Sequence, residues 1–262
     1  MRVSCLPGWL LCLFVGVAWP IHAMAVSVSV SGQVDRPGVQ SLNGNARLGD
    51  AATAAQVRPE AYVLGASWTQ KSRQLEQMRL QAGLLYELGA VADQARREGN
   101  APLAELSAKL RQWLQAMPVT GRRVVRTLDP GALYADDADD LPLEDGDTLD
   151  YPQRPSTVRV VGAVRKSCEL PHVALQDARK YVKACATQMA DRDFLYVIQP
   201  DGKVFELGIA LWNESAPMVL APGAIVYVPL DSRLTAGAAD AVFGREMADF
   251  IATQPLDGGV LP

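Results

Sequence analysis

The chain has 262 residues, and its 25 Lys and Arg residues against 29 Asp and Glu residues give a formal net charge of −4. This length allows two domains of moderate size. A mildly acidic chain without basic clusters argues against nucleic acid as a partner, because that binding needs clustered Lys and Arg opposite phosphate groups. The same charge balance argues against adsorption to anionic lipid.

The N-terminal segment, residues 1–25, has the order of a cleavable secretory signal. Arg2 supplies the positive charge, residues 6–21 are almost wholly apolar, and Ala23-Met24-Ala25 forms a small-residue cleavage motif. The apolar run is shorter than the roughly 20 residues that a membrane span needs. We therefore expect cleavage after Ala25, with Ala23 as the alternative, and a periplasmic protein without stable membrane insertion. An uncleaved N-terminal anchor is the other interpretation.

Two segments of the chain share one pattern and indicate an internal repeat. Residues 28–34 and 158–164 both alternate β-branched residues with a period of two, and a glycine, Gly32 or Gly162, interrupts each at the same place. A similar helix opener follows each strand, and it contains Asp50 in the first copy and Asp177 in the second. A carboxylate there favours the positive end of a helix, so we predict that both aspartates are caps.

Both copies also end alike, with a glycine turn before a final strand at residues 143–152 and 220–229. The second copy adds a hairpin, residues 194–207, with Asp201-Gly202 at its turn. Each unit therefore reads as one helix laid over a small mixed sheet, which is an α+β fold.

The first unit is longer because a helical pattern interrupts it. Apolar residues recur at spacings of three and four from about residue 69 to residue 117, and Glu98-Gly99-Asn100 breaks the run. This pattern predicts an inserted antiparallel helical hairpin whose apolar stripes face each other. The first stripe is Leu75, Met78, Ala82, Leu85 and Leu88, and the second is Leu103, Leu106, Leu110, Trp113 and Met117.

The C-terminal tail, residues 233–262, contains an amphipathic helix by the same criterion. Its apolar face is Val242, Phe243, Met247, Phe250 and Ile251. This face must be buried on something, and we expect it to dock back on the second domain. The alternative is a helix released to contact a partner or a bilayer surface.

Only Cys168 and Cys185 remain after signal cleavage. An even number of cysteines in an oxidising compartment favours a disulfide between them. The alternatives are two buried thiols or half of a metal site. We predict no metal, because a zinc site normally needs four ligands and His172 is the one histidine left.

The sequence gives little sign of catalysis. A single histidine removes most schemes that use imidazole, and no nucleophile-elbow, zinc-protease or phosphate-loop motif is present. We therefore predict a protein that is not an enzyme and has no cofactor. A carboxylate-based enzyme acting on glycan is the alternative. Its candidate residues, which we interpret as a solvated connection, are Asp136, Asp137, Asp139, Asp140, Glu144, Asp145 and Asp147.

One basic feature is a candidate binding site, namely Arg122 and Arg123 in the segment Thr120-Gly121-Arg122-Arg123. Arginine presents a planar fork of donors that suits carboxylates or sugar hydroxyls. The alternative is an internal salt bridge or a tie to the backbone.

The order of these parts resembles the GfcC family of capsule biosynthesis proteins. The resemblance rests on residues 28–38, the Gly65-Ala66 step before the hairpin, residues 120–123, residues 220–229 and the amphipathic tail. The repeat unit is also similar to the sugar-export β-grasp (SLBB) modules of Wza-type outer-membrane polysaccharide exporters.

The resemblance implies two tandem ubiquitin-like β-grasp domains, residues 26–154 and 155–232. It also implies a periplasmic, non-enzymatic accessory protein, a monomer, that binds polysaccharide or capsule export proteins, with Arg122 as a functional position. A structural subunit of an outer-membrane export assembly is the alternative. A channel-forming role is not expected, because the chain lacks the exporters' lipid-attachment cysteine and extra N-terminal domain.

Overall fold

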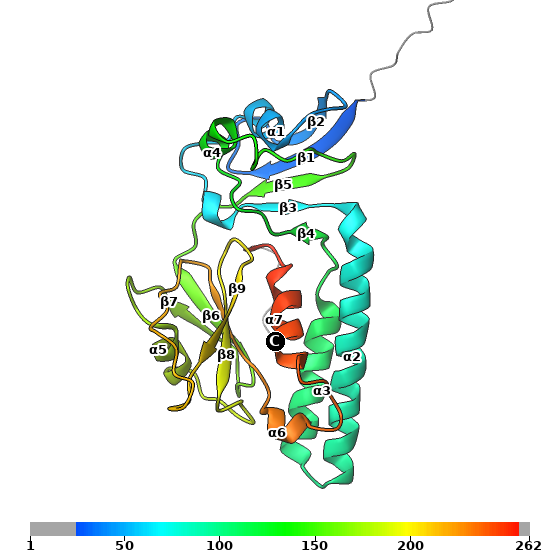
Figure 1. The fold of residues 1–262 in the computed structure, drawn as a ribbon, viewed down its shortest axis with the longest axis vertical. Helices are drawn as coiled ribbons and strands as arrows, with labels where there is room; N and C mark the ends of the chain where they lie inside the picture. The colour runs from blue at the N-terminus through cyan, green and yellow to red at the C-terminus, as the bar shows by residue number, and fades with distance from the viewer. Residues whose placement is uncertain (1–24, 257–262) are drawn as a thin grey trace, which may run out of the picture.

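The computed structural model describes residues 25–256 (Figure 1). The predicted signal residues 1–24 and residues 257–262 lie outside this range, as does the expected cleavage motif up to Met24. None of the helices within residues 25–256 is long and apolar enough to cross a membrane.

The described chain contains two five-stranded sheets that are built alike. In the first, β1 (Val26–Gly32) alternates buried valines with more exposed serines, which is the pattern of a strand with one buried face. The strand order is β2-β1-β5-β3-β4, with β1 and β5 parallel and the other neighbours antiparallel. The other strands are β2 (Gly38–Leu42), β3 (Ser67–Thr69), β4 (Arg122–Arg123) and β5 (Thr148–Tyr151).

The second sheet has the corresponding order, β7-β6-β10-β8-β9, with the same parallel pair in the same place. Its strands are β6 (Thr157–Gly162), β7 (Cys168–Pro171), β8 (Phe194–Ile198), β9 (Val204–Gly208) and β10 (Ile225–Val228). Each sheet carries a helix after its first hairpin, α1 (Leu48–Ala55) or α5 (Ala178–Lys183). The predicted repeat and the α+β class are confirmed.

The two glycines that mark the repeat occupy equivalent positions. Gly32 has a φ of +87° and Gly162 a φ of +102°, and each lies beside a carbonyl oxygen of the parallel partner strand. A Cβ atom on Gly32 would lie 2.1 Å from the oxygen of Tyr151, and one on Gly162 would lie 2.2 Å from that of Val228. Both positions therefore require glycine, because the φ angle is positive and because a Cβ atom would collide with the partner strand.

The predicted alignment of the helix openers is wrong by one helical turn. Asp177 is the N-cap of α5, and its side chain accepts from the backbone N–H of Arg179. The N-cap of α1 is Arg47, and Asp50 lies three residues later, where its carboxylate accepts from the Arg47 N–H at 2.9 Å. Both aspartates are caps, as predicted, but at different positions, because either position can satisfy N–H groups at a helix start.

The inserted hairpin consists of α2 (Gln74–Arg97) and α3 (Ala101–Ala116), preceded by the short turns η1 (Val63–Gly65) and η2 (Lys71–Arg73). It joins β3 to β4, the place that the Pro200-Asp201-Gly202 turn takes in the second sheet. The whole predicted stripe of α3 is buried. The predicted stripe of α2 is wrong over most of its length, because Leu75, Met78 and Ala82 are exposed and Leu85 is only partly buried. The buried side of α2 is centred on Leu84, Leu88 and Val91.

The last helix, α7 (Phe243–Ala252), docks as predicted and also contacts the hairpin. Figure 1 shows α7 between the second sheet and α2–α3. Phe243, Met247, Phe250 and Ile251 are buried there, whereas Val242 remains 53% exposed. The hairpin, α7 and the second sheet consequently share one apolar core, while the first sheet has a separate, smaller core with α1 and α4 (Pro130–Ala135). A further short helix, α6 (Ser232–Thr235), precedes α7.

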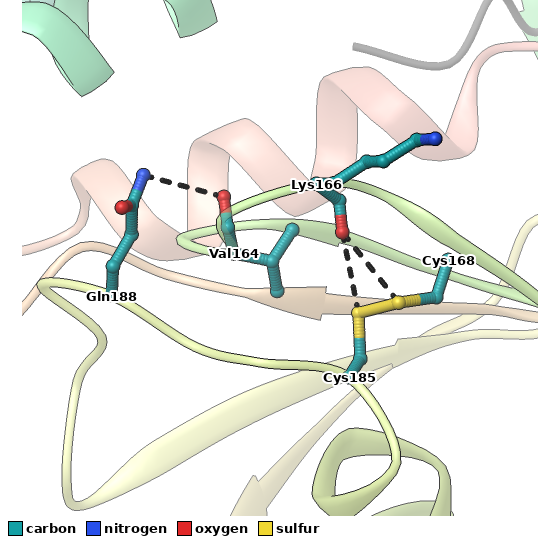
Figure 2. Close-up of a disulfide and its surroundings, with 5 residues drawn as sticks. All are labelled: Val164, Lys166, Cys168, Cys185 and Gln188. Atoms are coloured by element: carbon teal, nitrogen blue, oxygen red, sulfur yellow. Dashed lines mark hydrogen bonds between the residues drawn. A yellow bond between two sulfur atoms is a disulfide. The ribbon is translucent and has the colours of Figure 1, made fainter.

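Cys168 and Cys185 form the predicted disulfide. It joins the edge strand β7 to the end of α5, and the carbonyl oxygen of Lys166 lies 3.5 and 3.4 Å from the two sulfur atoms (Figure 2). The equivalent positions in the first domain are Gly38 and Ala55, so that domain has no disulfide corresponding to this one.

We expect the double variant Cys168→Ser/Cys185→Ser to lose about 3 kcal/mol of unfolding free energy, because the crosslink restricts the unfolded chain. Urea unfolding of the variant, and of the unchanged protein with reductant, should give the same loss. Intact-mass measurement should show a gain of two hydrogen masses on reduction. An unchanged unfolding midpoint after complete reduction would contradict the expectation.

Candidate functional site

The strand β4 lies where the two halves of the molecule meet. The hairpin returns to the first sheet through β4, and Gly121 makes this possible with a φ of +74° and a close approach to the backbone of Gln70. The end of α7, the β8–β9 turn and the start of α2 all lie beside β4 (Figure 1). The sequence-predicted residues Arg122 and Arg123 therefore lie at a junction of four elements.

Two adjoining cavities of about 430 and 340 Å³ flank β4 and form one groove, which we call the β4 groove. They share Arg122, Val124, Asp249 and Thr253. The remaining lining residues come from η2, α2, β4, the β8–β9 turn, β9 and α7. They are Arg73, Glu76, Gln77, Leu80, Arg123, Gly202, Lys203, Val204, Phe205, Arg245 and Ala252. A third cavity of about 180 Å³, lined in part by Arg123, Arg126 and Asp201, extends from the groove on the side of the first sheet.

Arg122 forms the floor of the groove and holds the junction together. Its side chain is buried, and its guanidinium donates to four backbone carbonyls in three segments of the chain. These acceptors are the oxygens of Pro200 at 2.6 Å, Gln254 at 3.0 Å, Ala252 at 3.2 Å and Ala66 at 3.5 Å. Two of the four lie at the C-terminal end of α7, where the helix dipole favours a cation.

The burial of Arg122 lowers the pKa of its guanidinium to about 10, and Asp201 partly opposes that shift. The side chain therefore remains charged at neutral pH. Its donors are directed to backbone oxygens, which is the internal tie that the sequence left open as the alternative to ligand binding. The structure thus places Arg122 as a positioning residue beneath the groove.

Arg123 has a different environment. Its guanidinium lies 4.8 Å from the ring centre of the buried Trp68 and donates to the side-chain oxygen of Gln70 at 3.3 Å. It is only partly buried and lines two of the cavities. Arg123 can therefore offer donors to a ligand while Trp68 holds its orientation.

The β4 groove has an excess of positive charge in a protein that is acidic overall. Its lining includes the cationic residues Arg73, Arg122, Arg123, Lys203 and Arg245, against the carboxylates of Glu76 and Asp249. Arg245 pairs with Asp249 at 2.9 Å, Arg73 approaches Glu76 at 3.6 Å, and Lys203 pairs with Asp201 at 2.7 Å. The cations of all three pairs are exposed to solvent. Phe205, which is 38% exposed, adds an aromatic surface. Such a groove suits a ligand that has carboxylates and apolar ring faces.

A buried carboxylate, Asp147, supports the floor beneath Arg123. Its Oδ2 atom accepts from the indole Nε1 of Trp68 at 2.8 Å, from the backbone N–H of Glu144 at 2.9 Å and from the amide of Gln70 at 3.3 Å. Its Oδ1 atom has no partner among the described residues. Burial raises the pKa of the Asp147 carboxyl group, and these hydrogen bonds oppose that rise.

We expect Asp147→Ala to lose about 2–4 kcal/mol of unfolding free energy, because Trp68 and the other donors lose their acceptor. Asp147→Asn keeps an acceptor and removes the buried charge. Because the pKa is raised in the folded state, the stabilising protonated form of Asp147 is lost as the pH rises through that pKa. Asp147→Asn should therefore be at least as stable as the unchanged protein at pH 7, and the difference should shrink in acid. Urea unfolding of both proteins at pH 7 and in acid tests this. If Asp147 stabilised the fold as a carboxylate, Asp147→Asn would be less stable than the unchanged protein at pH 7.

The acidic segment is more ordered than the solvated connection that the sequence indicated. The carboxylate of Asp139 is nearly buried and binds Arg126, which also contacts Asp136 at 2.7 Å. Asp140 accepts from the N–H of Gly49 at the start of α1. Arg126 lowers the pKa of Asp139, whereas a catalytic acid needs a raised pKa. Asp147 has a raised pKa, but it is 1% exposed and out of reach of a substrate.

Several groove residues were not predicted as a site from the sequence, namely Arg73, Lys203, Phe205, Arg245 and Asp249. Lys203 and Phe205 lie in the predicted second hairpin, and Arg245 and Asp249 on the polar side of the predicted tail helix. Nothing in their local pattern brings them to Arg123, because the contact depends on how α7 packs. Within residues 25–256, no group of three or more His, Cys, Asp or Glu residues is placed to hold a metal ion.

Comparisons with known proteins agree with this architecture. Residues 23–151 match the family described as Capsule biosynthesis GfcC, N-terminal, and residues 166–254 match Capsule biosynthesis GfcC C-terminal. The chain is also 32% identical over 168 residues to a protein of Escherichia coli (strain K12) called Uncharacterized protein YjbG. That alignment covers 63% of this chain and 65% of the relative. The two matched segments follow one another and together cover most of the chain. This protein therefore belongs to the GfcC family of capsule biosynthesis proteins.

Proposed function

We propose that this protein is a non-enzymatic, periplasmic accessory protein of capsule or exopolysaccharide biosynthesis or export, and that it binds an acidic segment of the polysaccharide in the β4 groove. Membership of the GfcC family supports a role in capsule biosynthesis, and the cationic groove supports an acidic ligand. Capsule export proteins are the partners that we expect to receive or deliver that polymer.

The periplasmic location is supported by two separate features. The N-terminal segment has the order of a cleavable secretory signal. The disulfide between Cys168 and Cys185 is of a kind that persists in oxidising compartments.

The observation that carries the proposal is the composition of the β4 groove. Cationic side chains outnumber carboxylates there, although the chain as a whole is acidic. Arg123 and Lys203 can pair with uronate carboxylates, and Phe205 can contact the apolar face of a sugar ring. In the acidic segment, Asp140 accepts from the start of α1, and Asp136 and Asp139 bind Arg126, which favours a binding role over glycan hydrolysis.

The proposal is tested by calorimetric titration of the chain lacking residues 1–25. The probes are hexagalacturonate, which carries carboxylates, and cellohexaose, which is neutral. We expect preferential binding of the acidic probe, weakened by salt because the groove charges are exposed. In Lys203→Glu/Arg245→Glu the affinity should fall by about tenfold or more, since each lost charged contact is worth roughly one to three kcal/mol.

The matched control is Arg97→Glu/Lys109→Glu, which makes the same charge change at exposed positions on the hairpin outside the groove. This control should bind as the unchanged protein does. Equal loss in the two double variants would mean that net charge, and not the groove, governs binding. Absence of binding to the acidic probe by the unchanged protein would overturn the proposal for this class of polymer.

A further inference from the structure

A tight loop after β9 presents two large apolar side chains to solvent. Leu211 is 99% exposed and Trp212 is 72% exposed, in a protein whose other described tryptophans, Trp68 and Trp113, are buried. An exposed tryptophan leaves a large apolar area in water, and adjacent large apolar side chains on a surface can mark a contact with something else. The question is what the indole of Trp212 would contact.

The loop that carries Trp212 is held by its own polar groups. The side chain of Asn213 accepts from the N–H of Ala210 at 3.0 Å and donates to the carbonyl of Asp193 at 2.9 Å. Arg179 donates to the carbonyls of Gly208 at 3.0 Å and Ser215 at 2.7 Å, which closes the base of the loop. The polar groups are directed inward, so Trp212 is displayed on a rigid support.

The indole itself is also fixed in orientation. Its Nε1 atom donates to Asp193 Oδ1 at 3.2 Å, and its ring meets the ring of Phe194 at an interplanar angle of 88° with 6.1 Å between centres. A side chain that is both exposed and held in one orientation loses little conformational entropy when a ligand binds. This is the property of a preformed binding surface.

The surroundings of Trp212 favour a sugar over an apolar protein surface. The other carboxylate oxygen of Asp193 binds Arg233 at 2.6 Å, and both Arg233 and Arg192 have exposed side chains. A pyranose ring has one apolar face of C–H groups and a rim of hydroxyls. The face suits the negative quadrupole of an indole, and the rim suits neighbouring carboxylate and guanidinium groups.

We propose that Trp212, with Asp193 and Arg233 beside it, is a second glycan subsite that stacks on the face of a pyranose ring. This inference rests on the proposed function, because it assigns the same polymer a second point of contact. The β4 groove includes Lys203 and the start of β9 at Val204 and Phe205, and Trp212 follows the end of β9 at Gly208. A polymer lying along this edge strand, which is about 17 Å long, contacts both places.

Three indole N–H signals report on the two sites separately. In the chain lacking residues 1–25 the tryptophans are Trp68, Trp113 and Trp212. Trp68 contacts Arg123 and reports on the β4 groove, Trp113 is buried in the core and serves as a reference, and Trp212 reports on the new subsite. Nuclear magnetic resonance with hexagalacturonate and cellohexaose as probes then follows all three, with assignments from Trp212→Phe.

We expect the hexagalacturonate probe to shift the Trp212 and Trp68 signals and leave Trp113 unchanged. Trp212→Ala should weaken binding by roughly three- to tenfold, the range that an aromatic contact supports. Trp212→Phe should restore part of the affinity, and the matched control Leu211→Ala should leave it unchanged.

Each other outcome has a definite meaning. A shift at Trp68 with no change at Trp212, and unchanged affinity in Trp212→Ala, overturns the second subsite and leaves the groove. A shift at Trp212 alone supports the subsite and overturns the groove as the glycan site. Equal losses in Leu211→Ala and Trp212→Ala, with no recovery in Trp212→Phe, overturn ring stacking and indicate a general apolar contact such as a protein partner.

Discussion

Arg122→Ala is expected to lower the free energy of unfolding by about 3–5 kcal/mol, the largest effect that we predict for a single side chain. The substitution removes the donors of four backbone carbonyls and opens a hole where the first sheet, α7 and the β8–β9 turn meet. The loss should appear in urea unfolding. Hydrogen exchange should also become faster at the C-terminal end of α7.

The neighbouring substitution Arg123→Ala serves as the control. It removes a contact with Trp68 of about 0.5–1 kcal/mol and leaves the four carbonyls paired. Arg123→Ala should therefore change stability little while weakening the binding of an acidic glycan. If Arg122→Ala unfolded at the same urea concentration as Arg123→Ala, the proposal that Arg122 holds the junction together would be wrong.

Gly32→Ala is the second substitution with a large expected effect, at about 3 kcal/mol or more. An added Cβ would lie 2.1 Å from the carbonyl oxygen of Tyr151, which is backbone of the parallel partner strand and cannot rotate away. The positive φ of Gly32 adds a penalty for any L-residue. Gly162→Ala should cause a comparable loss, because the second copy repeats the geometry.

Gly38→Ala separates the two causes. Gly38 has a φ of +111°, but a Cβ atom there would meet nothing within 4 Å. This control should therefore lose only the conformational part, about 1–2 kcal/mol. Urea unfolding that gave Gly32→Ala and Gly38→Ala equal losses would show that the partner strand moves to accept the methyl group.

The repeat was predictable from the sequence because its signals are local. Alternation of valines before Gly32 and Gly162 indicates a strand with one buried face, and a glycine interrupts both runs at the same place. The hairpin and its break were predictable for a similar reason. Asn100, the last residue of the predicted break, caps α3 by accepting from the N–H of Leu103.

The parts that could not be predicted depend on contacts between distant segments. Leu75 and Met78 fit an apolar stripe by spacing, yet Gln77 occupies the buried side of α2 at that level, and the two apolar residues stay about half exposed. The acidic segment looked solvated by composition, whereas Asp139 and Asp147 found partners in Arg126 and Trp68. Periodicity describes one element at a time and does not identify its neighbours.

The candidate site was predictable only in part for the same reason. The sequence drew attention to Arg122 and Arg123 together, but it could not distinguish the buried arginine from the partly exposed one. Adjacent residues in a strand face opposite sides, and here the Arg122 guanidinium binds backbone carbonyls while that of Arg123 lies over Trp68. The remaining groove residues are contributed by α2, β9 and α7, and their approach to Arg123 follows from the docking of α7.

The shared core of the hairpin, α7 and the second sheet has a consequence for how the chain matures. The hairpin is synthesised in the first half of the chain, but the apolar side that includes Leu84 and Leu88 is covered by a helix that ends at Ala252. A nascent or C-terminally truncated chain therefore leaves that side open to water and to other chains. Folding of the hairpin cannot be completed until almost the whole protein has emerged, so the first half should not persist as an independent fragment.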